Sequence, residues 1–328
     1  MMYYAINATI GTPPQPFTGL IALDWSLLIL PSVDCWKSPC QGHNLYNGSA
    51  SSSYVGSNDE WGAIISNTMF LGNLSLDTLH FGGLDIKRQI FVDAHDVQSW
   101  GNLYKGFDGV IGLTPREKNT LPHFIPSPWQ NIVDDGLLEH NIFTLSLPSG
   151  PRSPGNPRQG GELTVGGIAR KYADSDFLCL PLASESMWHV PLDSMDWDDG
   201  QLHEDFDEDY TLQFSSVLPY ILLPFDFARR INKAIGAEVD GYYNRFPCER
   251  RERLPDLTFG VAGKKLVLTP LDYTFEMELS GKEGDMECFT GFQRDAVKTV
   301  VLGINFLGSF YMVFDQDEKE IRCKWIPN

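Results

Sequence analysis

One carboxylate stands out because it lies in a run of apolar residues. Residues 10–32 read IGTPPQPFTGLIALDWSLLILPS, and Asp24 is the single acidic side chain among them. A carboxylate with apolar neighbours can work as a general acid or base, because desolvation moves its pKa toward neutral. Asp24 is therefore a candidate catalytic residue. The alternative is a turn residue that only bonds its own backbone, as aspartates often do.

Histidines and cysteines form no second reactive centre in the sequence. The seven histidines are scattered, and Cys35, Cys40 and His43 have no fourth ligand at a spacing that suits zinc. The sequence contains no G-x-S-x-G elbow, Walker loop or dinucleotide fingerprint. We therefore expect neither a metal nor a cofactor.

Composition and charge exclude several classes of partner. The 328 residues are 42% hydrophobic and 12% aromatic, which is typical of a folded globular protein. There are 25 basic and 43 acidic residues, and the net charge of −18 repels nucleic acid and anionic membranes. No apolar run reaches the roughly 18 residues that a membrane span needs. We expect a monomer with no nucleic-acid partner and no membrane span.

Cysteines and glycosylation sequons favour an oxidising compartment. Six cysteines are present, at positions 35, 40, 179, 248, 288 and 323, and sequons begin at Asn7, Asn47 and Asn73. Paired cysteines and sequons are typical of secreted or lumenal glycoproteins. The start, MMYYAINATIG, lacks the basic and apolar regions of a signal peptide, so we expect that a signal was removed.

Short apolar runs separated by Gly, Pro, Asn and Asp predict strands along nearly the whole chain. Helical patterns occur only near 128–138 and 225–237, so the predicted fold class is mainly β with few short helices. Residues 148–161 are rich in proline and glycine and predict an exposed loop. Residues 193–210 carry nine acids, which favours a solvated loop over a cation site.

A faint internal repeat predicts two similar halves. Asp24 lies 88 residues before Gly112, and Val217 lies 86 residues before Gly303. Each half thus pairs an apolar strand and turn with a later strand that ends in hydrophobic-hydrophobic-Gly. The repeat predicts two related β lobes that face one another across a cleft, which we place at 1–165 and 166–328.

The chain resembles the pepsin family of aspartic proteases. The matching segments are YYAINATIGTPPQPF, GFDGVIGL, GGELTVGG and VVLGINFLGSFYMVFD, and they occur in the family's order from one end of the chain to the other. The resemblance implies a two-lobed β fold with a central cleft. In that family each lobe contributes an Asp-Thr/Ser-Gly loop, and the two aspartates share a proton and activate a water.

Counting along the resemblance places other residues where the two catalytic aspartates are expected. The family's first aspartate lies eleven residues after the Gly of Gly-Thr-Pro and nine before a Pro, and Gly11 and Pro31 both lead to Ala22. Leu23 then takes the Thr/Ser position and Asp24 the glycine position. The second count, back from Pro224, gives Ser215. Aligning Asp24 itself with the catalytic aspartate would require deleting two residues.

The expected cleft lining departs from the family at further positions. Ile65, Ser66, Asn67 and Thr68 replace the flap's Tyr-Gly-Thr-Gly, and Leu-Gly-Asp becomes Leu-Gly-Ile at Ile304. The full set that we expect to line the cleft is Leu23, Asp24, Ser26, Ile65, Ser66, Asn67, Thr68, Ser216, Val217, Leu218 and Ile304.

The resemblance also implies disulfides. Cys35–Cys40 and Cys248–Cys288 match family bridges. Cys179 and Cys323 remain, in strands expected to lie near each other, and we expect them to pair; buried free thiols are the alternative.

The missing carboxylates lead to the hypothesis of a pseudoprotease. On this reading the protein is not a peptidase, and a remodelled, more apolar cleft binds a small apolar ligand or a protein target. A repurposed small-molecule isomerase or cyclase and a secreted inhibitor are the alternatives, so whether the protein is an enzyme stays open. An active aspartic endopeptidase ranks last.

Overall fold

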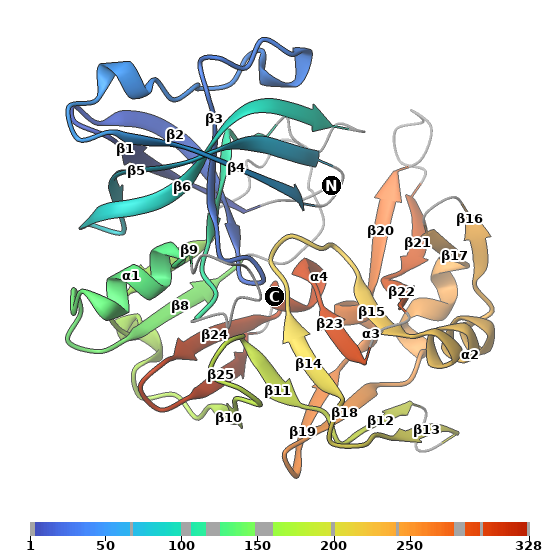
Figure 1. Ribbon diagram of the computed structural model, residues 1–328. Coiled ribbons are helices and arrows are strands. Elements are labelled where there is room, and N and C mark those ends of the chain that lie inside the picture. Colours follow the sequence, from blue (N-terminus) through green and yellow to red (C-terminus); the bar gives the residue numbers. More distant parts are fainter. Residues whose placement is uncertain are drawn as a thin grey trace. The chain divides into compact units, whose positions relative to one another are not determined.

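The computed structural model confirms a mainly β protein with few short helices (Figure 1). It describes residues 4–65, 68–99, 106–115, 125–147, 160–197, 201–240, 243–278, 286–295 and 298–326. The chain divides into two compact units. Unit 1 comprises residues 1–141, 164–167 and 185–187, and unit 2 comprises 142–163, 168–184 and 188–328. The lobe boundary after residue 165 and the cleft between the lobes stay predictions.

Unit 1 is built on one seven-stranded sheet. Its strands are β1 (Ala5–Ile10), β2 (Gln15–Ala22), β3 (Leu28–Pro31), β4 (Val55–Ile65), β5 (Thr68–Phe81), β6 (Leu84–Ser99) and β7 (Gly109–Gly112). Their order is β1-β2-β7-β3-β6-β5-β4, and a further pairing of β1 with β5 brings the sheet back on itself. Every residue of β3 and β7 is buried, which explains the unbroken apolar sequence of these central strands. Most of β5 alternates buried and half-buried residues, as expected of a strand with one face on the core.

The other strands form four smaller sheets in the part of the chain that the structure describes. These strands are β8 (Ile142–Ser146), β9 (Glu162–Val165), β10 (Leu178–Pro181), β11 (His189–Pro191), β12 (Ser194–Trp197), β13 (Leu202–Asp205), β14 (Thr211–Phe214), β15 (Ile221–Pro224), β16 (Glu238–Asp240), β17 (Tyr243–Phe246), β18 (Leu257–Val261), β19 (Lys264–Leu268), β20 (Thr274–Glu278), β21 (Met286–Thr290), β22 (Phe292–Asp295), β23 (Thr299–Leu302), β24 (Phe310–Asp315) and β25 (Glu320–Trp325). The sheet orders are β10-β25-β24-β8-β9, β11-β14-β23-β15-β22, β13-β12-β18-β19 and β16-β17-β21-β20.

Both predicted helices are present. They are α1 (Pro128–Asp134), whose cap Ser127 accepts a hydrogen bond from the backbone of Gln130, and α2 (Phe225–Ile235), which ends at the left-handed Gly236. Two further helices of one turn are α3 (Pro270–Tyr273) and α4 (Ile304–Leu307). Short 3₁₀ turns are η1 (Ser38–Cys40), η2 (Gly48–Ala50), η4 (Arg170–Tyr172) and η5 (Cys248–Arg253). No helix among the described residues is both long and apolar enough to cross a membrane.

The internal repeat has a counterpart in the strand pairing. In unit 1, β7 pairs parallel with β2 and antiparallel with β3, and β3 pairs parallel with β6. In unit 2, β23 pairs parallel with β14 and antiparallel with β15, and β15 pairs parallel with β22. The two halves therefore share the arrangement that the spacing of Gly112 and Gly303 predicted.

Two of the three expected disulfides form, Cys35–Cys40 and Cys248–Cys288. The third expectation is wrong for this structure, because Cys179 and Cys323 are free thiols. Their strands β10 and β25 are neighbours as expected, but Cys179 lies opposite Arg322 and Cys323 opposite Leu178. This register, displaced by one residue, directs the two thiols to opposite faces of the sheet. Burial and the neighbouring Cys179 raise the pKa of Cys323 to about 12, which keeps this thiol protonated.

The acidic stretch at 193–210 is also more ordered than expected. Two of its segments form the antiparallel strands β12 and β13, and basic partners offset several of its acids. Lys298 contacts Asp207 and Asp209, and Arg230 contacts Glu204. The solvated-loop prediction is therefore wrong for β12 and β13, whose residues pair in a sheet. The loop predicted at 148–161 falls mostly on residues 148–159, outside the described residues.

Candidate functional site

The loop that carries Asp24 joins β2 to β3 and wraps the end of β7. Gly112 donates its backbone N–H to Leu27 (3.0 Å), Leu113 donates to the carbonyl of Ala22 (2.8 Å), and Thr114 donates to Trp25 (3.3 Å). The close fit explains the glycine. A Cβ on Gly112 would lie 2.3 Å from the carbonyl oxygen of Trp25 and 2.7 Å from the nitrogen of Leu27. The loop is thus fixed from both sides by the strand that it encloses.

Side chains in this loop differ sharply in burial. Ala22 and Leu23 are at most 1% exposed, and Ser26 is also buried, whereas Asp24 is half-buried. The Oδ1 atom of Asp24 is inaccessible to solvent. Asp24 is therefore a partly desolvated carboxylate at the turn between two central strands, the environment that the apolar sequence around it predicted.

The corresponding loop of unit 2 joins β14 to β15 and encloses the end of β23. Ser215 donates its backbone N–H to Leu302 (2.9 Å), and Ile304 donates to Leu218 (2.7 Å). A Cβ on Gly303 would lie 2.2 Å from the carbonyl oxygens of both Leu218 and Tyr220. The same arrangement, a loop whose backbone bonds the end of a strand and packs against a glycine, therefore occurs in both units.

Side chains of the second loop are mostly internal. Ser215 and Ser216 are fully buried, Val217 and Ile304 are at most 3% exposed, and Leu218 is half-buried. The hydroxyl of Ser215 accepts hydrogen bonds from the backbone N–H groups of Val217 (3.3 Å) and Leu218 (3.2 Å). Ser215 therefore stabilises its own turn, as serine often does in tight turns.

The flap residues can be traced in part. Ile65 ends β4 and Thr68 begins β5, and each is 3% exposed. The Thr68 hydroxyl lies 3.1 Å from that of Ser99. Ser66 and Asn67 lie outside the described residues. Ile65 and Thr68 are therefore packed into unit 1, and their contribution to a cleft lining stays a prediction.

Sequence reasoning missed a half-buried histidine close to the second loop. His189 in β11 lies opposite Gln213 in β14, two residues before Ser215. Burial lowers the pKa of His189, and a hydrogen bond with Gln213 partly opposes this effect. The only signal in the sequence was a polar residue inside the apolar segment MWHVPL, which by itself predicts no partner.

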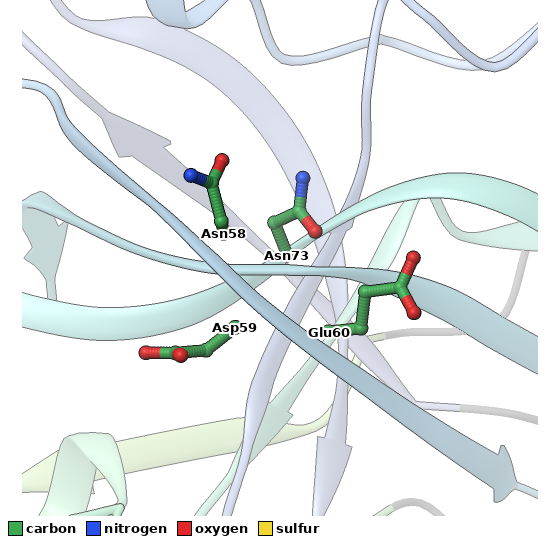
Figure 2. A pocket seen from close by; sticks show the side chains of 4 residues that line it. All are labelled: Asn58, Asp59, Glu60 and Asn73. Atoms are coloured by element: carbon green, nitrogen blue, oxygen red, sulfur yellow. The ribbon is translucent and has the colours of Figure 1, made fainter.

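A second feature that the sequence did not predict is a polar hollow on β4 and β5. The hollow measures about 610 Å³, and Figure 2 shows the four side chains that line it, Asn58, Asp59, Glu60 and Asn73. No group of three histidine, cysteine or carboxylate side chains that could hold a metal occurs among the described residues. The hollow is therefore a polar surface feature, distinct from the loops that enclose β7 and β23.

Comparisons with known proteins agree with the resemblance read from the sequence. The model of the eukaryotic aspartyl protease family matches residues 3–324. Vacuolar protease A of Aspergillus fumigatus is 30% identical over 95% of this chain and 76% of its own length. Cathepsin D of Homo sapiens is 31% identical, and cathepsin D of Gallus gallus 32% identical, each over 95% of this chain and 78% of its own.

These relatives correct the expected function. A pseudoprotease with a ligand-binding cleft was expected, but the relatives are named as proteases, and they match nearly the whole chain. The comparison favours the aspartic endopeptidase that ranked last. The earlier hypothesis gave decisive weight to Ala22 and Ser215. A carboxylate two residues further along the chain, at Asp24, was counted there at the glycine position and considered as an acid or base for other chemistry, but not as the peptidase carboxylate.

Proposed function

Because the chain belongs to the eukaryotic aspartyl protease family, we propose that it hydrolyses peptide bonds as an aspartic-type endopeptidase. The observation that carries the proposal is the family match over residues 3–324, together with relatives named as proteases along 95% of the chain. The strand pairing supports it. Both loops that enclose β7 and β23 keep their backbone hydrogen bonds and their close-fitting glycines.

Asp24 is the residue to which we assign the acid and base steps. The positions expected for the family's two aspartates hold Ala22 and Ser215. Alanine has no proton to exchange, and a serine hydroxyl exchanges one near neutral pH only with an activating partner. The β2–β3 loop supplies one carboxylate, that of Asp24. Its half-buried position and its solvent-inaccessible Oδ1 suit a group that must keep its orientation while a proton moves.

One carboxylate can serve both halves of the reaction in turn. The ionised Asp24 takes a proton from a water, and the water oxygen forms a bond to the scissile carbonyl carbon. The tetrahedral intermediate then collapses with cleavage of the C–N bond. The proton held by Asp24 passes to the leaving amine, which restores the carboxylate. Water is the only co-reactant, and the products are a new carboxyl and a new amino terminus.

The proposal extends to location. Relatives named as vacuolar proteases, two disulfides and three sequons support a lumenal or secreted protein of the secretory pathway. Microscopy of a tagged full chain with a vacuolar marker tests this part, and a diffuse cytosolic signal would contradict it.

Cleavage of denatured haemoglobin and casein, from about pH 2 to 7, tests the activity across the range in which carboxylates titrate. We expect pepstatin-sensitive turnover. Asp24→Asn should lower kcat at least about 100-fold, the usual contribution of general acid–base catalysis. Asp34→Asn is the matched control, because Asp34 is exposed and lies in the same unit. It should leave kcat unchanged.

Two results would contradict the proposal, the first its activity and the second only the role of Asp24. One is a correctly folded chain without turnover at any pH, measured beside an active family member as a positive control. The other is turnover that Asp24→Asn leaves intact, which would remove Asp24 from the reaction while keeping the peptidase assignment. Circular dichroism and the thermal midpoint of each variant distinguish loss of chemistry from loss of fold.

A further inference from the structure

The hollow on β4 and β5 has its origin in an irregular strand pairing. Gly56 pairs with Ser75 and Glu60 pairs with Asn73, so residues 57–59 lie opposite Leu74 alone. The extra residues form a bulge, which interrupts the ladder and bends the strand. Bonds within the bulge hold its shape. Asp59 donates its backbone N–H to the Ser57 hydroxyl (3.0 Å), and that hydroxyl donates to the Asp59 carboxylate (3.3 Å).

Asn73 is the sequon residue that faces this hollow. It is half-buried on β5, and Glu60 lies directly opposite on β4, which places their Cβ atoms about 5 Å apart. Figure 2 shows the side chains of Asn73 and Asn58 pointing to the same side of the strands, with the carboxylates of Asp59 and Glu60 at the flanks. The amide is thus surrounded by hydrogen-bonding groups and by space.

The three sequon asparagines differ in how their side chains are used. Asn7 accepts a hydrogen bond from the Thr18 hydroxyl (3.2 Å). Asn47 accepts bonds from the backbone N–H (3.1 Å) and the hydroxyl (2.7 Å) of Ser49 and caps η2. The side chain of Asn73 makes no hydrogen bond to any residue that the structure describes, and the same holds for Asn58 and Glu60.

We propose that Asn73 carries an N-linked glycan whose first sugar is seated in the hollow lined by Asn58, Asp59 and Glu60. The reaction is a glycosyl transfer from a lipid-pyrophosphate oligosaccharide. The Nδ2 atom of Asn73 forms a bond to the anomeric carbon, and the bond from that carbon to the phosphate oxygen breaks. The lipid pyrophosphate leaves with the electron pair, and the amide proton goes to a base of the transferase. The sequon Asn73-Leu74-Ser75 is the acceptor that this chemistry needs.

The lining residues match the chemistry of a sugar. A sugar presents hydroxyl groups that donate and accept, and the two carboxylates and the Asn58 amide offer acceptors and donors around the Asn73 side chain. The bulge supplies the room that a regular antiparallel pairing at this position would not leave. The inference goes beyond the peptidase proposal and rests only on its lumenal location.

Glycopeptide mapping of the full chain, secreted from a eukaryotic host, tests the modification without any substitution. We expect the peptide that contains Asn73 to carry a glycan. Asn73→Gln should remove one glycan from the intact mass, and Asn7→Gln and Asn47→Gln, the matched controls, should leave the Asn73 glycan in place. An unmodified Asn73 in the secreted chain would overturn the proposal, whether or not the other sequons are occupied. Peptidase activity is measured on the same preparations, so the two proposals fail independently.

The seat is tested by the rate at which a peptide:N-glycosidase releases the Asn73 glycan from the folded protein. Asn58→Ala combined with Glu60→Ala should speed this release about fivefold, the factor that one lost hydrogen bond produces. Release from the denatured chain should be unchanged. Equal rates of glycan release from the folded variant and from the unsubstituted protein would show that the first sugar does not lie in the hollow. This result would overturn the proposed position of the sugar.

Discussion

The β2–β3 loop of unit 1 and the β14–β15 loop of unit 2 are built on one backbone plan with different side chains. Each encloses the end of a central strand, and each brings backbone carbonyl groups close to a glycine there, Gly112 at the end of β7 or Gly303 directly after β23. Counted from Ala22 in unit 1 and from Ser215 in unit 2, the third residue is Asp24 and Val217, respectively. The first loop presents a half-buried carboxylate, and the second directs the Ser215 hydroxyl into its own turn.

The difference separates what holds the scaffold from what performs chemistry. Backbone hydrogen bonds and close contacts with glycine recur in both units, so they are the requirements of the fold. Asp24 and Ser215 do not correspond in type or in use. We therefore infer that the two loops contribute unequally, with the reactive group in unit 1 and a structural counterpart in unit 2.

Removal of each disulfide gives the largest expected contrast between the units. Cys248–Cys288 closes a 40-residue separation in unit 2 and Cys35–Cys40 a 5-residue separation in unit 1. Chain entropy predicts that replacing both cysteines by alanine costs about 4 kcal/mol in the first case and about 2 kcal/mol in the second. Guanidinium unfolding without reductant measures both. Equal losses would show that loop length does not set the stability of the two units.

Alanine at either close-fitting glycine tests the shared backbone plan. Gly303→Ala and Gly112→Ala should each lower the free energy of unfolding by about 3 kcal/mol, because the new Cβ has no room against backbone atoms. Gly106→Ala is the control, since a Cβ there would meet no atom within 4 Å. If either substitution is as mild as the control, that loop does not depend on its glycine, and the two loops are less alike than their strand pairing indicates.

Substitution of the two polar loop residues compares their roles directly. Ser215→Ala removes an acceptor of two backbone hydrogen bonds from a fully buried site and should cost about 1–2 kcal/mol with peptidase kcat nearly unchanged. Asp24→Asn should lower the peptidase kcat and change the free energy of unfolding by no more than about 0.5 kcal/mol. A larger stability loss for Asp24→Asn than for Ser215→Ala would assign the structural role to unit 1 instead.

Acid stability provides the smallest expected contrast. The two units should lose stability in different pH ranges. Burial lowers the pKa of His189 in unit 2, so the unfolded chain binds the proton more readily and stability falls as pH drops below about 6.5. In unit 1, burial alone would raise the pKa of Asp77, but hydrogen bonds from Ser53 and Tyr46 hold it below its usual value. The stability that Asp77 provides is present above about pH 4 and is lost as pH falls through its lowered pKa.

The variant His189→Gln isolates the unit 2 effect. Its thermal midpoint should fall less than that of the unsubstituted protein between pH 7 and pH 5, and the two should agree at pH 7. A parallel decline of both proteins over this range would mean that His189 is not the titrating group.

Several features of the fold could be read from sequence because they depend on local pattern. Short apolar runs predicted strands, β3 and β7 among them, and the helical pattern at 225–237 predicted α2. The spacing of Gly112 and Gly303 predicted the duplicated loops. Asp24 was identified for the same reason, since a single acid in an apolar run is visible without a structure.

Counting residues to Ala22 and Ser215 identified the substitutions but not the function. Counting assigns each residue to a position in the family. The function of a side chain depends instead on its location in the structure and on its contacts. Relatives named as proteases over nearly the whole chain therefore corrected a conclusion drawn from the missing aspartates and from the other departures in the expected cleft lining.

Other features were decided only by tertiary structure, and the physical reason is strand register. Cys179 and Cys323 lie on neighbouring strands, but a displacement of one residue directs their thiols to opposite faces. Similarly, the sequon at Asn73 can be identified in the sequence. The hollow beside it exists only because residues 57–59 bulge opposite Leu74 in the paired strands. Apolar patterns and spacing fix which segments become strands, and only the pairing of one strand with another fixes which side chains meet.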